Sequence, residues 1–382
     1  MTSYFIFRSV LFYVLEHAYL FWRFRFLRKN KFLLAISLPW FICMGFFPLV
    51  FLLLPPDSQA QRLLRHIDTI WQPFAYLCLI IFIAKDVFRG AAWLGKRATG
   101  ERSEPKTSAA ARRSRRKLLL LLFGGLVFAY GLYEARELRV NRLKLATGKL
   151  PPGAKRLRLV FAADLHIGPF LGGEQLGRVV DLILSEKPDC ILLGGDILDD
   201  AMQGTAADLA ELSRLRAPLG VFAVLGNHEA FGNSDRPMAF LRKAGITTLA
   251  GETANAGPLR IIGVDDPAVS AQKGRSTHNP MPLLRKTDGK RFTILLTHRP
   301  KLRKKSIGLF DLQLSGHTHG GQVIFLAPAM RAKYKVFTGL SSHSSEQGTS
   351  HLFVTTGVGF SKLPIRLLVP PEVATIDLVR AE

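Results

Sequence analysis

The sequence predicts an α/β fold, a β-sandwich flanked by helices, preceded by an N-terminal α-helical transmembrane module. From Pro151 onward, short apolar runs rich in β-branched residues alternate with helical patterns. Such alternation is typical of parallel strands joined by crossover helices. Residues 1–133 contain long, nearly uncharged apolar runs instead. A chain of 382 residues has room for both parts.

The clearest predicted membrane span is the run 32–54, which has 23 residues and no charged side chain. At about 1.5 Å per residue, this run can cross about 30 Å of hydrocarbon. The shorter runs 67–84 and 118–133 are expected to span as well. Charged residues interrupt the apolar pattern of the segment 4–22, so an interfacial helix and a fourth span are equal alternatives there. We therefore expect a membrane module with about three transmembrane helices in residues 1–133.

The formal net charge of +23 suggests an anionic partner. In the first 133 residues the basic side chains flank apolar runs, whereas a nucleic-acid-binding protein spreads them over a groove-shaped surface. The bilayer is therefore an expected partner, and no nucleic acid is expected. The three cysteines are spaced for neither a disulfide framework nor a zinc motif, so they leave the compartment open.

Basic residues also predict the orientation of this multi-pass cell-membrane protein. The loop 85–117 contains 11 Lys or Arg residues, against two in the loop 55–66, which places the loop 85–117 in the cytoplasm. If residues 118–133 then cross the bilayer, the rest of the chain faces outward, into the periplasm or the extracellular space. A second basic cluster, at 136–144, follows that helix and opposes this orientation.

Residues 134–154 are expected to connect the membrane module to a folded domain at 155–382. After the first alternating strands and helices, six more strands with fewer helices between them predict a second sheet packed on the first. These strands are expected at residues 259–264, 292–297, 312–316, 321–326, 351–356 and 373–379.

Polar side chains follow several of the predicted strands, at the point where each strand ends. In open α/β sheets the ligand crevice lies beyond the carboxyl ends of the strands, so we expect these side chains to converge. Carboxylate, amide and imidazole groups are ligands for divalent metal ions. The residues are Asp164, His166, Asp196, Asn227, His228, His298, His317 and His319.

Five short motifs carry most of these residues: ADLHIG, LGGDILD, LGNHE, LLTHRP and SGHTHGG. In these motifs and their order, residues from about 155 to 380 resemble the calcineurin-like metallophosphoesterases, and in particular their membrane-anchored YkuE/YaeI-like branch. The resemblance implies a metallophosphoesterase-type β-sandwich for residues 155–382 and a dinuclear metal centre with two divalent ions.

The resemblance also implies a role for each site residue. One ion would be held by Asp164, His166, Asp196 and His319, and the other by Asp196, Asn227, His298 and His317. Asp196 would bridge the two ions, while His228 would bind no metal and would contact the phosphate and its leaving group. The catalytic residues would therefore be His228 and Asp196. Family members use Mn, Fe or Zn, and a mixed nitrogen and oxygen ligand set does not select among them.

The implied activity is that of a metal-dependent phosphoric ester hydrolase. Two divalent ions and two carboxylates leave the site with a net positive charge that attracts phosphate. A hydroxide formed between the ions would attack a phosphodiester or pyrophosphate bond, and His228 would assist the leaving group. The membrane module favours a lipid-linked or envelope substrate. The alternatives are a non-catalytic scaffold with the same fold and a nuclease that uses the same centre.

Three further features leave alternatives open. Asp199 could either accept a hydrogen bond from a metal-binding histidine or cap a helix. Asp265 and Asp266 precede a proline and could form a turn or belong to the site. The basic run 298–306 could attract an anionic headgroup or could be a solvated face.

Overall fold

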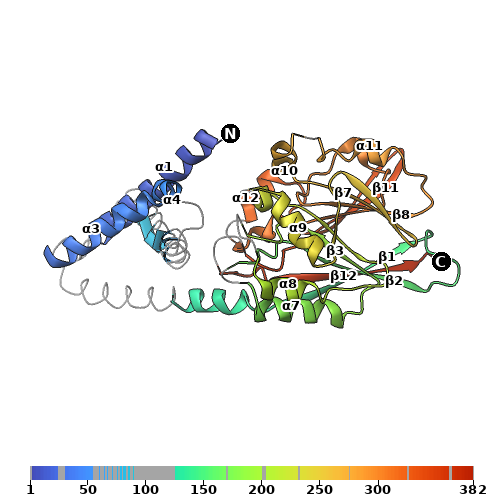
Figure 1. The fold of residues 1–382 in the computed structure, drawn as a ribbon, viewed down its shortest axis with the longest axis horizontal. Helices are drawn as coiled ribbons and strands as arrows, with labels where there is room; N and C mark the ends of the chain where they lie inside the picture. Colours follow the sequence, from blue (N-terminus) through green and yellow to red (C-terminus); the bar gives the residue numbers. More distant parts are fainter. Residues whose placement is uncertain are drawn as a thin grey trace, which may run out of the picture. The chain divides into compact units, whose positions relative to one another are not determined.

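The computed structural model describes residues 2–24, 31–54, 125–168, 171–199, 204–230, 233–274, 276–324, 327–360 and 364–381, with isolated positions between 60 and 89. The chain divides into two compact units, Met1–Leu126 and Val127–Glu382. Figure 1 draws both units and labels many of their helices and strands.

The first unit contains the helices α1 (Thr2–Arg23), α3 (Lys31–Gly45) and α4 (Phe47–Leu53). The sequence predicts one continuous helix for the span 32–54. The structure instead has two helices there, because a turn at Phe46 separates α3 from α4. Pro48 lies in the first turn of α4, where its missing N–H cannot continue the hydrogen bonding of α3. The predicted span 67–84 and the loop 85–117 lie largely outside the described residues, as do residues 118–124.

Among the described residues, no helix combines the length and the apolar character that a membrane span requires.

The second unit consists of two β-sheets, as the sequence predicts, and each has six strands. The strand expected at 373–379 in the second sheet lies instead in the first, between β1 and β2, because an apolar strand pattern does not show which neighbour a strand pairs with. The first sheet has the order β1-β12-β2-β3-β4-β5 and the second has the order β10-β11-β9-β8-β7-β6. Strands β2 to β5 are parallel to one another, as are β7, β8, β9 and β11. The strands of the first sheet are β1 (Arg139–Thr147), β2 (Arg156–Ala162), β3 (Cys190–Gly194), β4 (Val221–Val224), β5 (Thr247–Thr248) and β12 (Glu372–Arg380). Those of the second sheet are β6 (Glu252–Ala256), β7 (Leu259–Val264), β8 (Phe292–Thr297), β9 (Leu312–Ser315), β10 (Gly339–Ser345) and β11 (Gly348–Val354).

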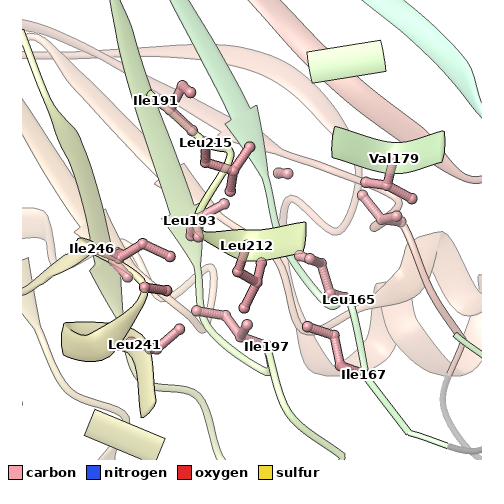
Figure 2. Close-up of a cluster of buried hydrophobic side chains, with 14 of the residues drawn as sticks. Leu165, Ile167, Val179, Ile191, Leu193, Ile197, Leu212, Leu215, Leu241 and Ile246 are labelled. Carbon is pink, nitrogen blue, oxygen red and sulfur yellow. The ribbon is translucent and has the colours of Figure 1, made fainter. Parts of the chain in front are cut away.

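Three hydrophobic layers stabilise this unit. Between the sheets lie buried side chains of β2, β3, β7, β8, β9 and β11, including Phe161 and Phe353. The other face of the first sheet is covered by α7 (Glu174–Ser185), α8 (Ala206–Leu212) and α9 (Asp235–Lys243). Figure 2 shows Val179, Leu212 and Leu241 of these helices in one cluster with Leu193 of β3. A smaller cluster around α11 (Met281–Leu284) covers the second sheet.

The remaining helical segments are short and lie in loops. They are α10 (Pro267–Gln272), α12 (Ala327–Lys333) and the 3₁₀ turns η1 (His228–Ala230), η2 (Lys304–Ser306) and η3 (His319–Gly321). Residues 125–134 are helical as well. Two of the 3₁₀ turns, η1 and η3, contain predicted site residues.

The expected connector at 134–154 differs from the structure, because its residues form β1. This strand pairs in parallel with β12 over all nine of its residues, so the second unit begins at Val127. Basic residues alternate with apolar ones in β1, and Leu145 is buried while Lys144 is exposed. Because the same basic residues also fit the charge pattern beside a membrane helix, the strand alternation was not recognised from the sequence.

The strand predicted at 321–326 is also wrong. The described part of that segment contains the end of η3 and a single bridge between Val323 and Leu367. Its apolar residues follow the Gly-Gly turn that ends the SGHTHGG motif, and the pattern of a short apolar run cannot distinguish a strand from such a loop. The strands β5, β6 and β10 were not predicted either.

Candidate dinuclear metal centre

The candidate site lies where strands of both sheets end. Asp164 and His166 follow β2, Asp196 follows β3, and Asn227 and His228 follow β4 in the first sheet. His298 follows β8, and His317 and His319 follow β9 in the second. Parallel strands bring their carboxyl ends to one edge of a sheet. The structure brings the aspartate and histidine side chains together, in the three overlapping groups described next.

The first group contains Asp164, His166 and His319. One ligand atom from each lies within 4.8 Å of the others, and all three residues are buried. The Nε2 atoms of His166 and His319 face each other at 3.1 Å. Two imidazole nitrogens directed at one point are the donor arrangement that a divalent ion such as Zn²⁺ takes.

The second group contains Asp196, His298 and His317. Nε2 of His298 lies 3.1 Å from Oδ2 of Asp196 and 3.1 Å from Nδ1 of His317. Asp196 also belongs to a third group, with His166 and His228, whose Nε2 atoms both lie 3.9 Å from its Oδ2 atom. The carboxylate of Asp196 therefore lies between the two halves of the site, as a bridging ligand would.

The side chain of Asn227 supports the fit of this site to two cations. Its Oδ1 atom is buried and has no hydrogen-bond partner among the described residues. A buried carbonyl oxygen is costly to leave unpaired, and an amide oxygen is a suitable ligand for a hard cation. The residues present, two carboxylates, one amide and four imidazoles besides His228, thus fit a pair of divalent ions.

The backbone of the site is held in an unusual conformation. Of the eight described non-glycine residues with positive φ, five are predicted ligands. Non-glycine residues rarely adopt this left-handed region, and such strain costs of order 1–3 kcal/mol per residue and gathers at functional sites. The five are Asp164, His166, Asp196, His317 and His319, with φ between 49° and 72°.

Close backbone contacts impose this conformation on Asp196. The amide of His228 donates to Oδ1 of Asp196 at 2.9 Å. A Cβ atom on Gly226 would lie 2.1 Å from that same oxygen. Only glycine therefore allows the strand end of β4 to pass so close to the carboxylate.

Glu229 organises the same region, a role that was not predicted from the sequence. Its buried carboxylate accepts hydrogen bonds from the amides of Asp196, Ile197, Leu198 and Gly226, at 2.6–3.1 Å. It thus joins the loops after β3 and β4. The acidic residue that ends LGNHE was a visible signal, but no sequence pattern shows which amides a carboxylate will accept.

Asp199 orients two of the imidazoles. Its Oδ1 atom lies 3.1 Å from Nδ1 of His166 and 3.1 Å from Nδ1 of His228. Burial raises the pKa of Asp199, but the hydrogen bond from His166 and the nearby His228 imidazole outweigh it and hold the pKa below its ordinary value. The helix-cap alternative is wrong, since Thr205 caps α8. With Nδ1 engaged, the Nε2 atoms are presented to the centre of the site.

The protonation of the other histidines follows from their neighbours. Burial lowers the pKa of His298, but the charge of Asp196 outweighs it and raises the pKa to about 9. Burial, reinforced by the charge of His298, lowers the pKa of His317 to about 2. Burial likewise lowers the pKa of His319. Neutral imidazoles at 317 and 319 keep their lone pairs available for a cation.

The aspartate pair before Pro267 has a structural role. Asp266 caps α10 by accepting from the amide of Ala268 at 2.8 Å, and its carboxylate also binds the guanidinium of Arg299. Asp265 is buried and accepts from Thr277 at 3.0 Å. Asp266 thereby fixes the residue that directly follows His298 in the basic run 298–306.

An α/β sandwich whose strand ends gather two aspartates, an asparagine and several histidines defines a class of metal-dependent phosphoesterases. Residues 157–321 match the family model described as calcineurin-like phosphoesterase. The chain is 34% identical over 255 residues to an uncharacterized metallophosphoesterase of Aquifex aeolicus, which covers 66% of this chain and 96% of that relative. The chain belongs to the calcineurin-like phosphoesterase family.

Two further relatives extend the comparison. The uncharacterized metallophosphoesterase YkuE of Bacillus subtilis is 30% identical over 270 residues, which are 67% of this chain and 91% of that protein. A Bos taurus protein named transmembrane protein with metallophosphoesterase domain is 26% identical over 330 residues, which are 80% of this chain and 72% of that protein.

Proposed function

We propose that the protein is a membrane-anchored phosphoesterase that uses two divalent cations to hydrolyse phosphodiester or pyrophosphate bonds. The observation that carries this proposal is the place of the Asp196 carboxylate between two groups of imidazoles. One cation would be held by Asp164, His166, Asp196 and His319, and the other by Asp196, Asn227, His298 and His317. A non-catalytic scaffold is less well supported, because each position that the family uses for a ligand retains a ligating side chain.

When bound, such cations would neutralise phosphoryl charge and activate a water molecule as nucleophile. The residues of the chain supply position and protons. The carboxylate of Asp199 lies 3.1 Å from Nδ1 of His228, and Nε2 of His228 faces Asp196 at the centre, where it can give a proton or a hydrogen bond to the leaving oxygen. Such assistance is typically worth about 10²–10⁴ in rate.

Membrane anchoring and the substrate class are further parts of the proposal. They are supported by the apolar runs of residues 1–133 and by the Bos taurus relative, which is named as a transmembrane protein. A site tethered at a bilayer meets amphiphilic molecules first, which favours a lipid-linked or envelope phosphate compound as substrate. The excess of basic residues in the loop 85–117 supports an outward-facing catalytic unit.

The full chain, purified in detergent, tests the activity. Its Mn, Fe and Zn content is measured together with hydrolysis of bis(p-nitrophenyl) phosphate and p-nitrophenyl phosphate. We expect bound metal, preference for the diester, and strong losses of turnover in Asp196→Asn and His228→Ala. Asp181→Asn on the exposed surface and His343→Ala in the strand β10 change the same residue types away from the site and serve as matched controls. Equal turnover in all five proteins would refute the catalytic proposal.

Reporter fusions test the orientation. A reporter that is active only outside the cytoplasm, fused after Tyr133, is expected to be active. Activity of a cytoplasmic reporter at the same position would reverse the proposed orientation without affecting the catalytic proposal.

A further inference from the structure

The largest completely buried side chain of the described residues is that of Arg366. Its guanidinium donates five hydrogen bonds, all to backbone carbonyls, at Thr356, Gly357, Gly359 and Val369. In the described parts of the chain, no carboxylate lies within ion-pair distance of it. A buried cation without a paired anion is costly, so an arginine at this position needs a specific role.

The charge of Arg366 persists at neutral pH. Burial lowers the pKa of its guanidinium to about 10, partly offset by the charges of Asp164, Glu372 and Glu134. A planar guanidinium has five N–H groups in a fixed fork, which suits several carbonyls around one centre. Lysine has the same charge but cannot reproduce that geometry.

The carbonyls that Arg366 binds belong mainly to the loop 356–359, and this loop lies against Asp164. The amide of Gly359 donates to the carbonyl of Asp164 at 2.7 Å, and that of Val358 donates to the carbonyl of Ala163 at 3.0 Å. A Cβ atom on Gly359 would lie 2.1 Å from the carbonyl oxygen of Leu165. The loop therefore supports the strained backbone of Asp164, whose φ is 55°.

The segment that carries Arg366 is in turn held by the helical residues 127–134. The amide of Arg366 donates to the carbonyl of Gly131 at 3.0 Å, and the amide of Leu368 donates to the buried carboxylate of Glu134. A Cβ atom on Gly131 would lie 2.5 Å from Cγ2 of Ile365, so the helix backbone and this segment are in direct contact. Gly131 belongs to the end of the run 118–133 that the sequence predicts as a membrane span, and Glu134 directly follows it.

We propose that Arg366 is a positioning residue for the metal centre, and that residues 127–134 support it there. Arg366 gathers the carbonyls of the loop 356–359, and the loop fixes the backbone of Asp164 in the conformation that directs its carboxylate into the site. The end of the predicted anchor helix is then part of the support of the metal centre. This inference rests on the proposed function, since it takes Asp164 as a metal ligand.

The test measures the Mn²⁺ affinity of the full chain in detergent by calorimetric titration. The kcat and KM for bis(p-nitrophenyl) phosphate are measured on the same proteins. We expect Arg366→Lys to weaken Mn²⁺ binding about 10–100-fold, the effect usual for groups that orient metal ligands. Excess Mn²⁺ should restore most of the turnover, because the groups that contact the substrate are unchanged. A general loss of folding would not be reversed by the ion, so this rescue separates positioning from stability.

A second variant tests the helix. Glu134→Ala removes the acceptor for the amide of Leu368, and we expect a several-fold loss of Mn²⁺ affinity. Glu137→Ala removes an exposed carboxylate three residues later and should have no effect. Arg158→Lys, which alters an arginine paired with Asp377, is the control for Arg366→Lys.

The outcomes are distinct. Unchanged Mn²⁺ affinity in folded Arg366→Lys, or in Glu134→Ala if Arg366→Lys does not fold, overturns the inference. If the wild-type chain neither binds divalent cations nor hydrolyses phosphate esters, it is the proposed function that fails.

Discussion

The backbone amide of His317 donates to both carboxylate oxygens of Asp164, at 2.9 Å each, although the two residues are 153 positions apart. His317 follows β9 of the second sheet, and Asp164 follows β2 of the first. The hydrogen bonds therefore join the two sheets at the candidate metal centre. A change that separates the two sheets here would therefore also displace the carboxylate of Asp164 from the site.

Loss of the Asp199 carboxylate should weaken catalysis without unfolding the protein. In Asp199→Asn the neutral amide oxygen attracts the Nδ1 atoms of His166 and His228 less strongly than the ionised carboxylate does, so both imidazoles are held less firmly. We expect kcat/KM for a phosphodiester to fall about 10–100-fold. Steady-state kinetics at saturating Mn²⁺ measure the effect, and Asp181→Asn is the control. A change below twofold would contradict the role of Asp199.

Much of the site could be predicted from the sequence because its ligands follow strands at positions that short motifs mark. Asp196 and His298 are examples, since a strand pattern and a polar residue at its end suffice to place each of them. Arg366 and Glu229 could not be found in this way. Their roles depend on which distant carbonyls and amides they meet, and a single sequence contains no signal for those contacts.

The fold was predictable to a similar extent. Apolar alternation identified the central strands such as β8, but β1 was missed because its basic residues also fit the charge pattern beside a membrane helix. The break at Phe46 was missed since hydropathy alone does not register that Pro48 interrupts a helix.

Replacement of Glu229 should affect stability as well as activity. Glu229→Gln keeps the size of the side chain but replaces one acceptor oxygen by an amide that donates, and this amide would face backbone N–H groups. Hydrogen bonds to a charged acceptor contribute about 1.5–3 kcal/mol, so we expect a loss of that size in the free energy of unfolding. Chemical denaturation measures it. A loss below about 0.5 kcal/mol would show that Glu229 does not hold the loops after β3 and β4.

The pair Arg158 and Asp377 provides a test of pH dependence away from the site. Arg158 donates from Nε and Nη2 to the two carboxylate oxygens of Asp377, at 2.7 and 2.9 Å. The hydrogen bond from Arg158 lowers the pKa of Asp377 below its ordinary value. Because the folded pKa is the lower one, the pair stabilises the fold above the unfolded pKa of about 3.9 and loses this effect as pH falls through the folded pKa.

We therefore expect Asp377→Asn to be less stable than the wild type by about 1 kcal/mol at pH 7. The difference should shrink as the pH falls from about 4 toward the folded pKa. Urea denaturation of both proteins from pH 7 to pH 3 measures it, and other titrating groups affect the two proteins alike. A constant difference over this range would show that the interaction does not depend on the charge of Asp377.

A single methyl group at Gly226 should disable the centre. In Gly226→Ala the added Cβ would lie 2.1 Å from Oδ1 of Asp196, so the carboxylate or the backbone must move. A displacement of about 1 Å at a reacting centre can cost about 10²-fold in rate, and we expect a loss of at least that size in kcat/KM together with weaker Mn²⁺ binding. Gly148→Ala is the matched control, because its Cβ would meet no atom within 4 Å. Equal activity in the two variants would mean that the close approach of β4 to Asp196 has no part in forming the site.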